Sequence, residues 1–272
     1  MWYIGIDIGS TCAKIAVMDA GRRLRYHSVQ PTGWSSVETA QAIRSKLETI
    51  GYLHRTDAPQ PAEKIAFVTA TGYGRISVPY ADKTVTEISC HAKGAEWIFG
   101  SSDLCVIDIG GQDTKVIRLQ DGMVRDFIMN DKCSAGTGRF LEVMGNSMAL
   151  RPGELCELAR NGSGVKISSM CTVFAESEVI SLIGRGEKRE NIAHAVVESI
   201  ADKVASQSVR LYHAGDRVCL TGGLCECDYL RASLEEKLHA AIETNQYGRY
   251  AGAIGAALFS LKNAGEEPHD LS

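Results

Sequence analysis

The sequence predicts an α/β fold built from two similar half-domains. An eight-residue frame with Asp-Ile-Gly at its start and Lys at its eighth position occurs twice, at 7–14 and at 108–115. Each copy follows an apolar, strand-like run and precedes two further strand-like runs. Helical spacing of apolar residues dominates much of the remaining chain. The repeat indicates that each half contributes one turn able to hold a phosphate.

The first half is predicted from alternating and helical spacing of its apolar residues. In order, we expect strands at 4–8, 15–19 and 24–29, a helix at 36–50, a strand at 65–69, a glycine-rich turn at 71–75 and a helix at 88–99. Gly51 and Gly100 stand where the two helices should end. The polar stretch 57–61 contains proline and is expected to be a loop.

The second half repeats the opening meander and then becomes mainly helical. We expect strands at 104–109, 115–119, 124–129 and 218–221, and helices at 137–148, 153–160, 172–183, 189–212, 228–241 and 250–258. Asp121-Gly122 should form the hairpin turn of the meander. The last helix is rich in small residues, which suits close packing. We therefore divide the chain into a first half, 1–102 with the C-terminal helix 253–272, and a second half, 103–252.

Composition restricts the class of protein. The chain has 272 residues, 44% of them hydrophobic and 23% charged, which is typical of a packed globular protein. The net charge of −4 gives no basic footprint for nucleic acid. No apolar run is long enough to span a membrane, and the N-terminus lacks the basic segment of a signal peptide. We expect a cytoplasmic protein in a reducing compartment.

Three glycine turns at the ends of apolar strands predict a nucleotide site. Backbone N–H groups in such turns attract phosphates, and a lysine adds a positive charge. The candidate binding residues are Gly9, Ser10, Thr11, Cys12, Ala13, Lys14, Gly110, Gly111, Gln112, Thr221, Gly222 and Gly223. Asp7 and Asp108 end their strands beside these turns and could hold Mg²⁺ through its waters. Asp7, Asp108 and Gln112 are the candidate catalytic residues, Gln112 because it could orient a water. A single turn of this kind would be weak support, since ordinary tight turns look alike.

These motifs resemble the superfamily of sugar kinases, actin and heat-shock ATPases. The 7–14 and 108–115 stretches look like its two phosphate loops, Thr221-Gly222-Gly223 like its adenosine motif, and 251–258 like its second connecting helix. The resemblance implies duplicated ribonuclease-H-like halves with ATP in the cleft between them. It implies ATP binding and hydrolysis without specifying their purpose.

Two of the nine cysteines attract particular interest. Cys133 and Cys171 each stand shortly before a predicted helix, where free N–H groups would favour a thiolate. A zinc site or a 4Fe–4S cluster needs four such ligands, so two per chain would become four in a homodimer. The alternative is a pair of buried or redox-sensing thiols. Cys225 and Cys227 form a C-x-C pair that could bind metal, although small buried side chains are the simpler interpretation for them and for the other five cysteines.

The sequence around these two cysteines resembles the activator ATPases of 2-hydroxyacyl-CoA dehydratases and the ATPase subunits of benzoyl-CoA reductase. The matching stretches are 130–140 and 170–179, with further likeness at 71–75 and 87–92. The resemblance implies that Cys133 and Cys171 ligate one 4Fe–4S cluster shared by a homodimer. It also implies that ferredoxin or flavodoxin supplies an electron, and that ATP hydrolysis drives its transfer to a partner iron–sulfur dehydratase or reductase.

Two other functions share the predicted fold. A small-molecule kinase would need a catalytic base and a substrate pocket, and no base is obvious beyond the loop aspartates. A non-catalytic nucleotide-binding regulator would need neither. The stretch 245–250 also lacks a Pro-x-x-Gln-type pattern found in some members of the family, so adenine contacts near Arg249 are left unassigned.

Overall fold

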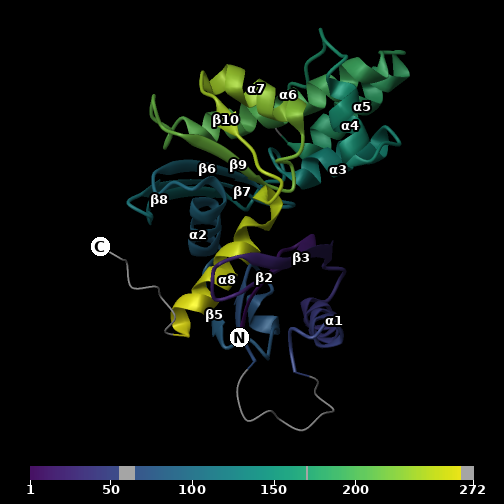
Figure 1. Cartoon of the computed structure of the whole chain (residues 1–272). Coiled ribbons are helices and arrows are strands. Elements are labelled where there is room, and N and C mark those ends of the chain that lie inside the picture. Colours follow the sequence, from purple (N-terminus) through teal and green to yellow (C-terminus); the bar gives the residue numbers. More distant parts are fainter. Residues whose placement is uncertain (55–64, 170, 265–272) are drawn as a thin grey trace. The chain divides into compact units, whose positions relative to one another are not determined.

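The computed structural model describes residues 1–54, 65–169 and 171–264 (Figure 1). The predicted loop at 57–61 lies outside the described residues. The chain separates into two units, Met1–Gly100 with the segment from Tyr250 onward, and Ser101–Arg249. We call these unit 1 and unit 2. No helix in the described part of the chain combines the length and apolarity needed to cross a membrane.

Each unit contains one five-stranded sheet, and the two sheets share one topology. The strand order is β3-β2-β1-β4-β5 in unit 1 and β8-β7-β6-β9-β10 in unit 2. In both sheets the first three strands form an antiparallel meander, and the last two add in parallel. The strands are β1 Trp2–Ile8, β2 Cys12–Met18, β3 Leu24–Pro31, β4 Ala66–Thr71, β5 Lys83–Thr84, β6 Leu104–Ile109, β7 Thr114–Gln120, β8 Met123–Asn130, β9 Val218–Gly222 and β10 Ile242–Glu243.

The helices are unequally divided between the units. Among the described residues, unit 1 holds three, of which α8 packs against α2 and β1, whereas α3 to α7 all belong to unit 2 (Figure 1). The helices are α1 Ser36–Thr49, α2 Glu87–Phe99, α3 Gly138–Ser147, α4 Pro152–Ala159, α5 Thr172–Gly184, α6 Arg189–Ser208, α7 Asp228–Leu238 and α8 Ala251–Asn263. Short 3₁₀ turns occur at Arg75–Ser77 and Gly248–Tyr250.

Strand register explains the eight-residue frame. Asp7 pairs with Lys14 across the β1–β2 ladder, and Asp108 pairs with Lys115 across the β6–β7 ladder. Directly opposed residues of an antiparallel pair project from the same face of the sheet, so each aspartate meets its own lysine. The duplication continues beyond the frame, because each outer ladder carries an irregularity at the same relative position, Val17/Met18 and Arg118/Leu119.

Burial follows the position of each strand in its sheet. The central strand β6 is buried throughout and β1 is buried except at its first residue, as expected for strands covered on both faces. The outer strands β3 and β8 are partly exposed, with half-buried and exposed positions alternating along most of their length. In the hairpin between β7 and β8, Asp121 and Gly122 both have positive φ, at 52° and 70°. The predicted Asp-Gly turn is therefore confirmed.

Most predicted elements are present, with differences at their ends. The helix expected over 189–212 ends at Ser208, and the helix expected over 228–241 ends at Leu238. His239 follows with φ 50°, and this left-handed residue stops the second of these helices. The last helix continues to Asn263. The two-residue strands β5 and β10 were not predicted because they are too short for periodicity to register.

Candidate functional site

The first frame surrounds Asp7 at the end of β1. Gly9 to Cys12 form a tight turn in which the Gly9 N–H donates to the Cys12 carbonyl at 3.1 Å. The Lys14 ammonium lies 3.5 Å from Asp7 Oδ2. Asp7 is buried, and its Oδ1 accepts no hydrogen bond from any described residue. A buried carboxylate oxygen in this condition is a natural acceptor for a water or a ligand.

Two glycines approach this carboxylate closely. A Cβ placed on Gly72 would lie 2.5 Å from Asp7 Oδ1, and one on Gly252 would lie 2.7 Å from Asp7 Oδ2. The Cβ on Gly252 would also lie 2.9 Å from His91 Nε2. Any side chain at either position would displace Asp7, so the start of α8 and the end of β4 both shape its surroundings. His91 is buried on α2 beside this group.

The second frame places Asp108 in a network of paired groups. Asp108 Oδ1 accepts a hydrogen bond from the Thr221 hydroxyl at 2.7 Å, and Oδ2 lies 3.2 Å from the Lys115 ammonium. Lys115 also contacts Asp113 at 2.9 Å and is only 1% exposed. Asp113 occupies the frame position that Cys12 holds in unit 1. The frame alone could have indicated this extra carboxylate, since it is the sixth residue of the second copy.

The glycine turn after β9 has a counterpart after β4. Thr221 pairs with Asp108 in parallel register, and Thr71 pairs with Asp7 in the same way. Gly222 and Gly72 follow with φ of 88° and 83°, and a Cβ on either would lie within 2.5 Å of a carbonyl oxygen of the neighbouring strand. Each unit therefore assembles an aspartate, a lysine, a threonine and a glycine turn at one end of its sheet. Gln112, Thr11 and Gly223 are exposed at the tips of these turns, where a ligand could reach them.

The second loop is hydrogen-bonded to the start of α3. The N–H groups of Gly138 and Arg139 donate to the carbonyls of Gly110 and Gly111 at 2.9 and 2.7 Å. The Thr114 hydroxyl donates to the Gly136 carbonyl at 2.6 Å. These bonds satisfy amides that a helix N-terminus would otherwise leave without partners. The phosphate-type loop and the segment that follows Cys133 are thus one connected structure.

Cys133 lies in an exposed turn ahead of α3 rather than at the helix cap. Asn130 holds this turn, because its side-chain amide donates to the carbonyls of Cys133 at 2.8 Å and Ala135 at 3.1 Å. The Cys133 N–H donates back to Asn130 Oδ1 at 3.3 Å. Gly136, with φ 83°, then lets the chain turn into the helix. Asn130 is a structuring residue that the sequence alone did not reveal.

Cys171 is the N-cap residue of α5, as its sequence context predicts. The loop before it is fixed by Glu178, whose carboxylate accepts hydrogen bonds from the backbone N–H and the hydroxyl of both Ser168 and Ser169. These bonds, led by the Ser169 hydroxyl, lower the pKa of Glu178. The residues after the two cysteines meet directly, since the Ser134 and Thr172 hydroxyls lie 2.7 Å apart. The two cysteine segments are therefore tied together.

Cys133 and Cys171 differ from the other cysteines in exposure. Both are exposed free thiols, while Cys12 is half-buried and the remaining six are buried. Beside Cys171, the side chains of Val173 and Phe174 are about two-thirds exposed, at 67% and 65%. Within the described residues, no three His, Cys, Asp or Glu side chains lie close enough to hold a metal ion.

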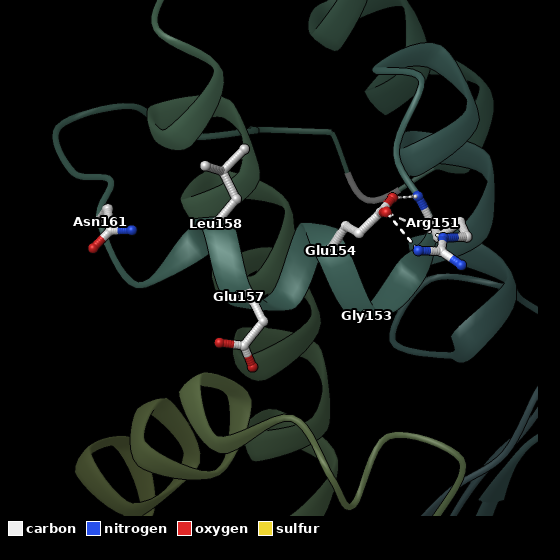
Figure 2. Close-up of a pocket in the computed structure, with 6 residues that line it drawn as sticks. All are labelled: Arg151, Gly153, Glu154, Glu157, Leu158 and Asn161. Carbon is white, nitrogen blue, oxygen red and sulfur yellow. Dashed lines mark hydrogen bonds and ion pairs between the residues drawn. The ribbon is translucent and has the colours of Figure 1, made fainter.

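A surface depression of about 800 Å³ lies along α4 in unit 2 (Figure 2). Arg151 and the Glu154 carboxylate point toward one another across its rim, joined at 2.7 Å, whereas Glu157 points away from them. None of the predicted site residues lines it. The lining residues are Arg151, Gly153, Glu154, Glu157, Leu158 and Asn161. Arg249, where adenine contacts were left unassigned, forms an ion pair with Glu226 at 3.2 Å.

The duplicated sheets and their loops define the class of fold. The chain has the ribonuclease-H-like duplicated fold shared by sugar kinases and actin-like ATPases, as the sequence predicted. A ROK family glucokinase from Streptomyces griseus has this fold at 17% identity, with a TM-score of 0.57 over 95% of this chain and 99% of that one. At this level of identity the likeness shows the fold alone.

Within this class, the chain belongs to the BadF/BadG/BcrA/BcrD ATPase family, whose model matches residues 4–260. It is 41% identical to the (R)-2-hydroxyglutaryl-CoA dehydratase activating ATPase of Acidaminococcus fermentans over 266 residues, which cover 97% of this chain and 98% of that protein. This membership confirms the resemblance drawn from the sequence around Cys133 and Cys171.

Two solved structures agree with this membership. The crystal structure of component A of the A. fermentans (R)-2-hydroxyglutaryl-CoA dehydratase matches with a TM-score of 0.87 and 40% identity, covering 97% of this chain and 99% of that chain. The activator of 2-hydroxyisocaproyl-CoA dehydratase from Clostridium difficile, solved with bound ADPNP, matches with a TM-score of 0.85 and 34% identity over the full length of both chains.

Proposed function

We propose that this protein is an ATP-dependent electron-transfer activator. In this proposal a homodimer bridged by one 4Fe–4S cluster accepts an electron from ferredoxin or flavodoxin. ATP hydrolysis then drives transfer of the electron, at low potential, to a partner iron–sulfur enzyme such as a 2-hydroxyacyl-CoA dehydratase. Family membership and relatives named as dehydratase activators support the ATP-dependent activation in this proposal.

ATP or ADP is the proposed ligand of the glycine loops. The backbone N–H groups of the Gly9 and Gly110 turns, with Lys14, are suited to phosphate, and the ADPNP bound to the C. difficile activator supports the assignment. We assign the residues of the adenosine motif, Thr221 to Gly223, to the nucleoside. In this scheme Gln112, exposed at its turn, orients the attacking water.

The surroundings of the two aspartates favour different roles for them. Asp7 keeps one buried oxygen without a hydrogen-bond donor in the described structure, which fits a contact to the water shell of Mg²⁺. Both oxygens of Asp108 are engaged, by Thr221 and Lys115. We propose that Mg²⁺ is held chiefly by Asp7 through water, and that Asp108 contributes by fixing the second loop. A bound Mg²⁺ would neutralise phosphate charge during hydrolysis.

The observation that carries the proposal is the hydrogen-bonded connection from phosphate loop to cysteine. Gly138 and Arg139 bond the second loop to α3, Thr114 bonds it to Gly136, and the Ser134–Thr172 contact extends the connection to Cys171. A displacement of this loop on loss of the γ-phosphate would move both cysteine segments together. A kinase of the same fold would have no need to link its phosphate loop to two exposed thiols.

Cys133 and Cys171 are the proposed cluster ligands. Both thiols are exposed, and Asn130 and Glu178 hold the backbone around them, so their residue type and setting fit an iron–sulfur cluster. Such a cluster supplies one-electron chemistry at a potential that its hydrogen bonds and solvent exposure adjust. Two ligands from each of two chains give the required four, which leads to the proposed dimer.

Anaerobic reconstitution with iron and sulfide tests this proposal. We expect a brown protein with about two iron atoms per chain and a broad absorption at about 400 nm that dithionite bleaches. Cys133→Ala and Cys171→Ala should each lose the colour, while Cys225→Ala, which removes a buried thiol, should keep it. Activity is then measured as ATP-dependent electron transfer to a purified dehydratase.

The outcomes separate the proposed function from its alternatives. A colourless, iron-free protein that phosphorylates a sugar or acid would establish the kinase. A protein that binds ATP without turnover and without iron would establish a regulator. A brown protein whose electron transfer is indifferent to ATP would contradict the proposed coupling while preserving the cluster.

A further inference from the structure

Two buried cysteines of unit 2, neither of them a proposed cluster ligand, lie together. Cys156 is in the middle of α4, and Cys227 is the N-cap residue of α7. Both are free thiols in the same hydrophobic core, and their side chains hydrogen-bond each other. Neither belongs to the family motifs around Cys133 and Cys171, so this contact has no role in the proposed electron transfer.

An exposed ion pair connects the helices that carry the two thiols. Arg160 lies one helical turn after Cys156 on the same side of α4, and its guanidinium donates to Asp228 Oδ2 at 2.7 Å. Asp228 directly follows Cys227 in the chain. The pair thus lies close in the chain to both cysteines, on two helices that pack against each other.

The two thiols have unequal acidities. The hydrogen bond from Cys156 lowers the pKa of Cys227, and the N–H groups of Leu230 and Tyr229 at the start of α7 act in the same direction. The same bond to Cys227, together with burial, raises the pKa of Cys156. By contrast, burial is the main cause that raises the pKa values of Cys90, Cys105 and Cys225 to about 12. Cys227, at the start of α7, is therefore the more acidic of the two thiols.

We propose that Cys156 and Cys227 form a peroxide-sensitive dithiol that closes into an intramolecular disulfide. The Cys227 thiolate attacks hydrogen peroxide, an S–O bond forms as the O–O bond breaks, and hydroxide leaves, giving a sulfenic acid. The Cys156 sulfur then attacks the Cys227 sulfur, the S–S bond forms, and the sulfenic oxygen leaves as water with the Cys156 proton. The two thiols lose two electrons, and peroxide is reduced to the level of water.

The proposed disulfide joins α4 covalently to α7. Both residues retain slight exposure, 7% for Cys156 and 6% for Cys227. Closure protects Cys227 from irreversible oxidation beyond the sulfenic acid, and a dithiol reductant reopens the pair. The response is separate from the cluster thiols, because it requires neither Cys133 nor Cys171.

Peptide mapping of the full-length protein tests the inference. Anaerobically purified chain is treated with a small excess of hydrogen peroxide, alkylated with N-ethylmaleimide under denaturing conditions, and digested without reduction. We expect a cross-linked species that joins the tryptic peptide containing Cys156 to peptide 218–231, and we expect dithiothreitol to abolish it. In Cys156→Ser, dimedone should trap Cys227 as a sulfenic acid about tenfold faster than it traps Cys225.

Matched variants assign the sulfurs, because peptide 218–231 also contains Cys219 and Cys225. The cross-link should persist in Cys225→Ser and disappear in Cys227→Ser and in Cys156→Ser. Mapping of the wild-type chain alone decides whether the pair forms, so a variant that folds poorly does not obscure the result. Full alkylation of Cys156 and Cys227 after peroxide has oxidised Cys133 and Cys171 would overturn the inference. So would a cross-link that survives in Cys227→Ser.

Discussion

At the scale of single residues, the two halves of the duplication differ in the hydrogen-bond and ion-pair partners of the frame aspartate. Asp108 is held by Thr221 and by a lysine that a second carboxylate, Asp113, also contacts. Asp7 has Lys14 at 3.5 Å and one oxygen that no described residue donates to. Buried polar groups are almost always paired, so an exception of this kind points to a ligand. Of the two aspartates, Asp7 is therefore the better candidate for contact with a ligand.

Replacing Thr221 by valine should lower the free energy of unfolding substantially, whereas the same change at Thr71 should have little effect on it. Thr221→Val leaves Asp108 Oδ1 buried without its donor, a loss of about 1–3 kcal/mol of unfolding free energy. The Thr71 hydroxyl bonds no nitrogen or oxygen among the described residues, so Thr71→Val should change the unfolding free energy by less than about 1 kcal/mol. Urea unfolding of both variants measures the difference, and equal shifts would contradict this account.

Replacement of the two frame lysines should also affect the two halves unequally, with the larger loss of stability in the second half. Lys115→Met leaves two buried carboxylates facing each other and should destabilise the protein by about 3–5 kcal/mol. The Lys14 side chain is 19% exposed, so Lys14→Met should leave the fold intact but weaken ATP binding about tenfold or more. Thermal unfolding and nucleotide titration separate the two effects. Unchanged ATP affinity in Lys14→Met would remove Lys14 from the proposed phosphate site.

At the scale of elements, unit 1 depends on very close contact between two helices. A Cβ on Gly94 of α2 would lie 1.9 Å from the Ala251 carbonyl oxygen, and one on Gly255 of α8 would lie 1.8 Å from the Cys90 carbonyl oxygen. Backbones this close leave no space for side chains between them. The small-residue helix predicted at 250–258 does pack closely, and its main partners are α2 and β1.

A single methyl group should disturb this helix contact. Gly94→Ala should lower the unfolding free energy by about 1–3 kcal/mol, because α2 and α8 must move apart to admit it. Gly184→Ala is the control, since a Cβ at this position near the end of α5 meets nothing within 4 Å. The control should be neutral or slightly stabilising by helix propensity. Denaturant midpoints that fall equally in both variants would show that the close approach is unimportant.

At the scale of the whole molecule, the proposed cluster makes the protein's assembly depend on iron. Each chain offers two exposed thiols, on segments joined by the Ser134–Thr172 contact, and exposed Val173 and Phe174 lie beside one of them. In the proposed dimer the cluster would cross-link the chains. Ligand binding to the assembled state stabilises that state by mass action.

Removing iron should therefore weaken the dimer. We expect reconstituted protein to run as a dimer in native mass spectrometry under anaerobic conditions. Treatment with an iron chelator and oxidant should shift it toward monomer, with Cys133→Ala resembling the chelated protein. A dimer that persists unchanged in both cases would show that protein contacts alone hold it together.

Local patterns identified a large part of this structure in advance. The meanders, the Asp-Gly hairpin and the glycine turns depend on short-range periodicity and on φ preferences, and the structure confirms them. The position of Cys133 within its turn could not be predicted, because it depends on the Asn130 side chain returning to the backbone. The ends of α6 and α7 also escaped prediction, since helix ends respond to turn geometry more than to spacing.

The sequence by itself determined the duplication, the glycine turns and the likeness around Cys133 and Cys171, because these are carried by residues close together in the chain. Only the tertiary structure decided that Thr221 donates a hydrogen bond to Asp108, that Glu178 accepts hydrogen bonds from the serines before Cys171, and that Cys156 contacts Cys227. These contacts join distant segments whose approach is set by the packing of strands and helices, and no local pattern encodes a partner at that separation.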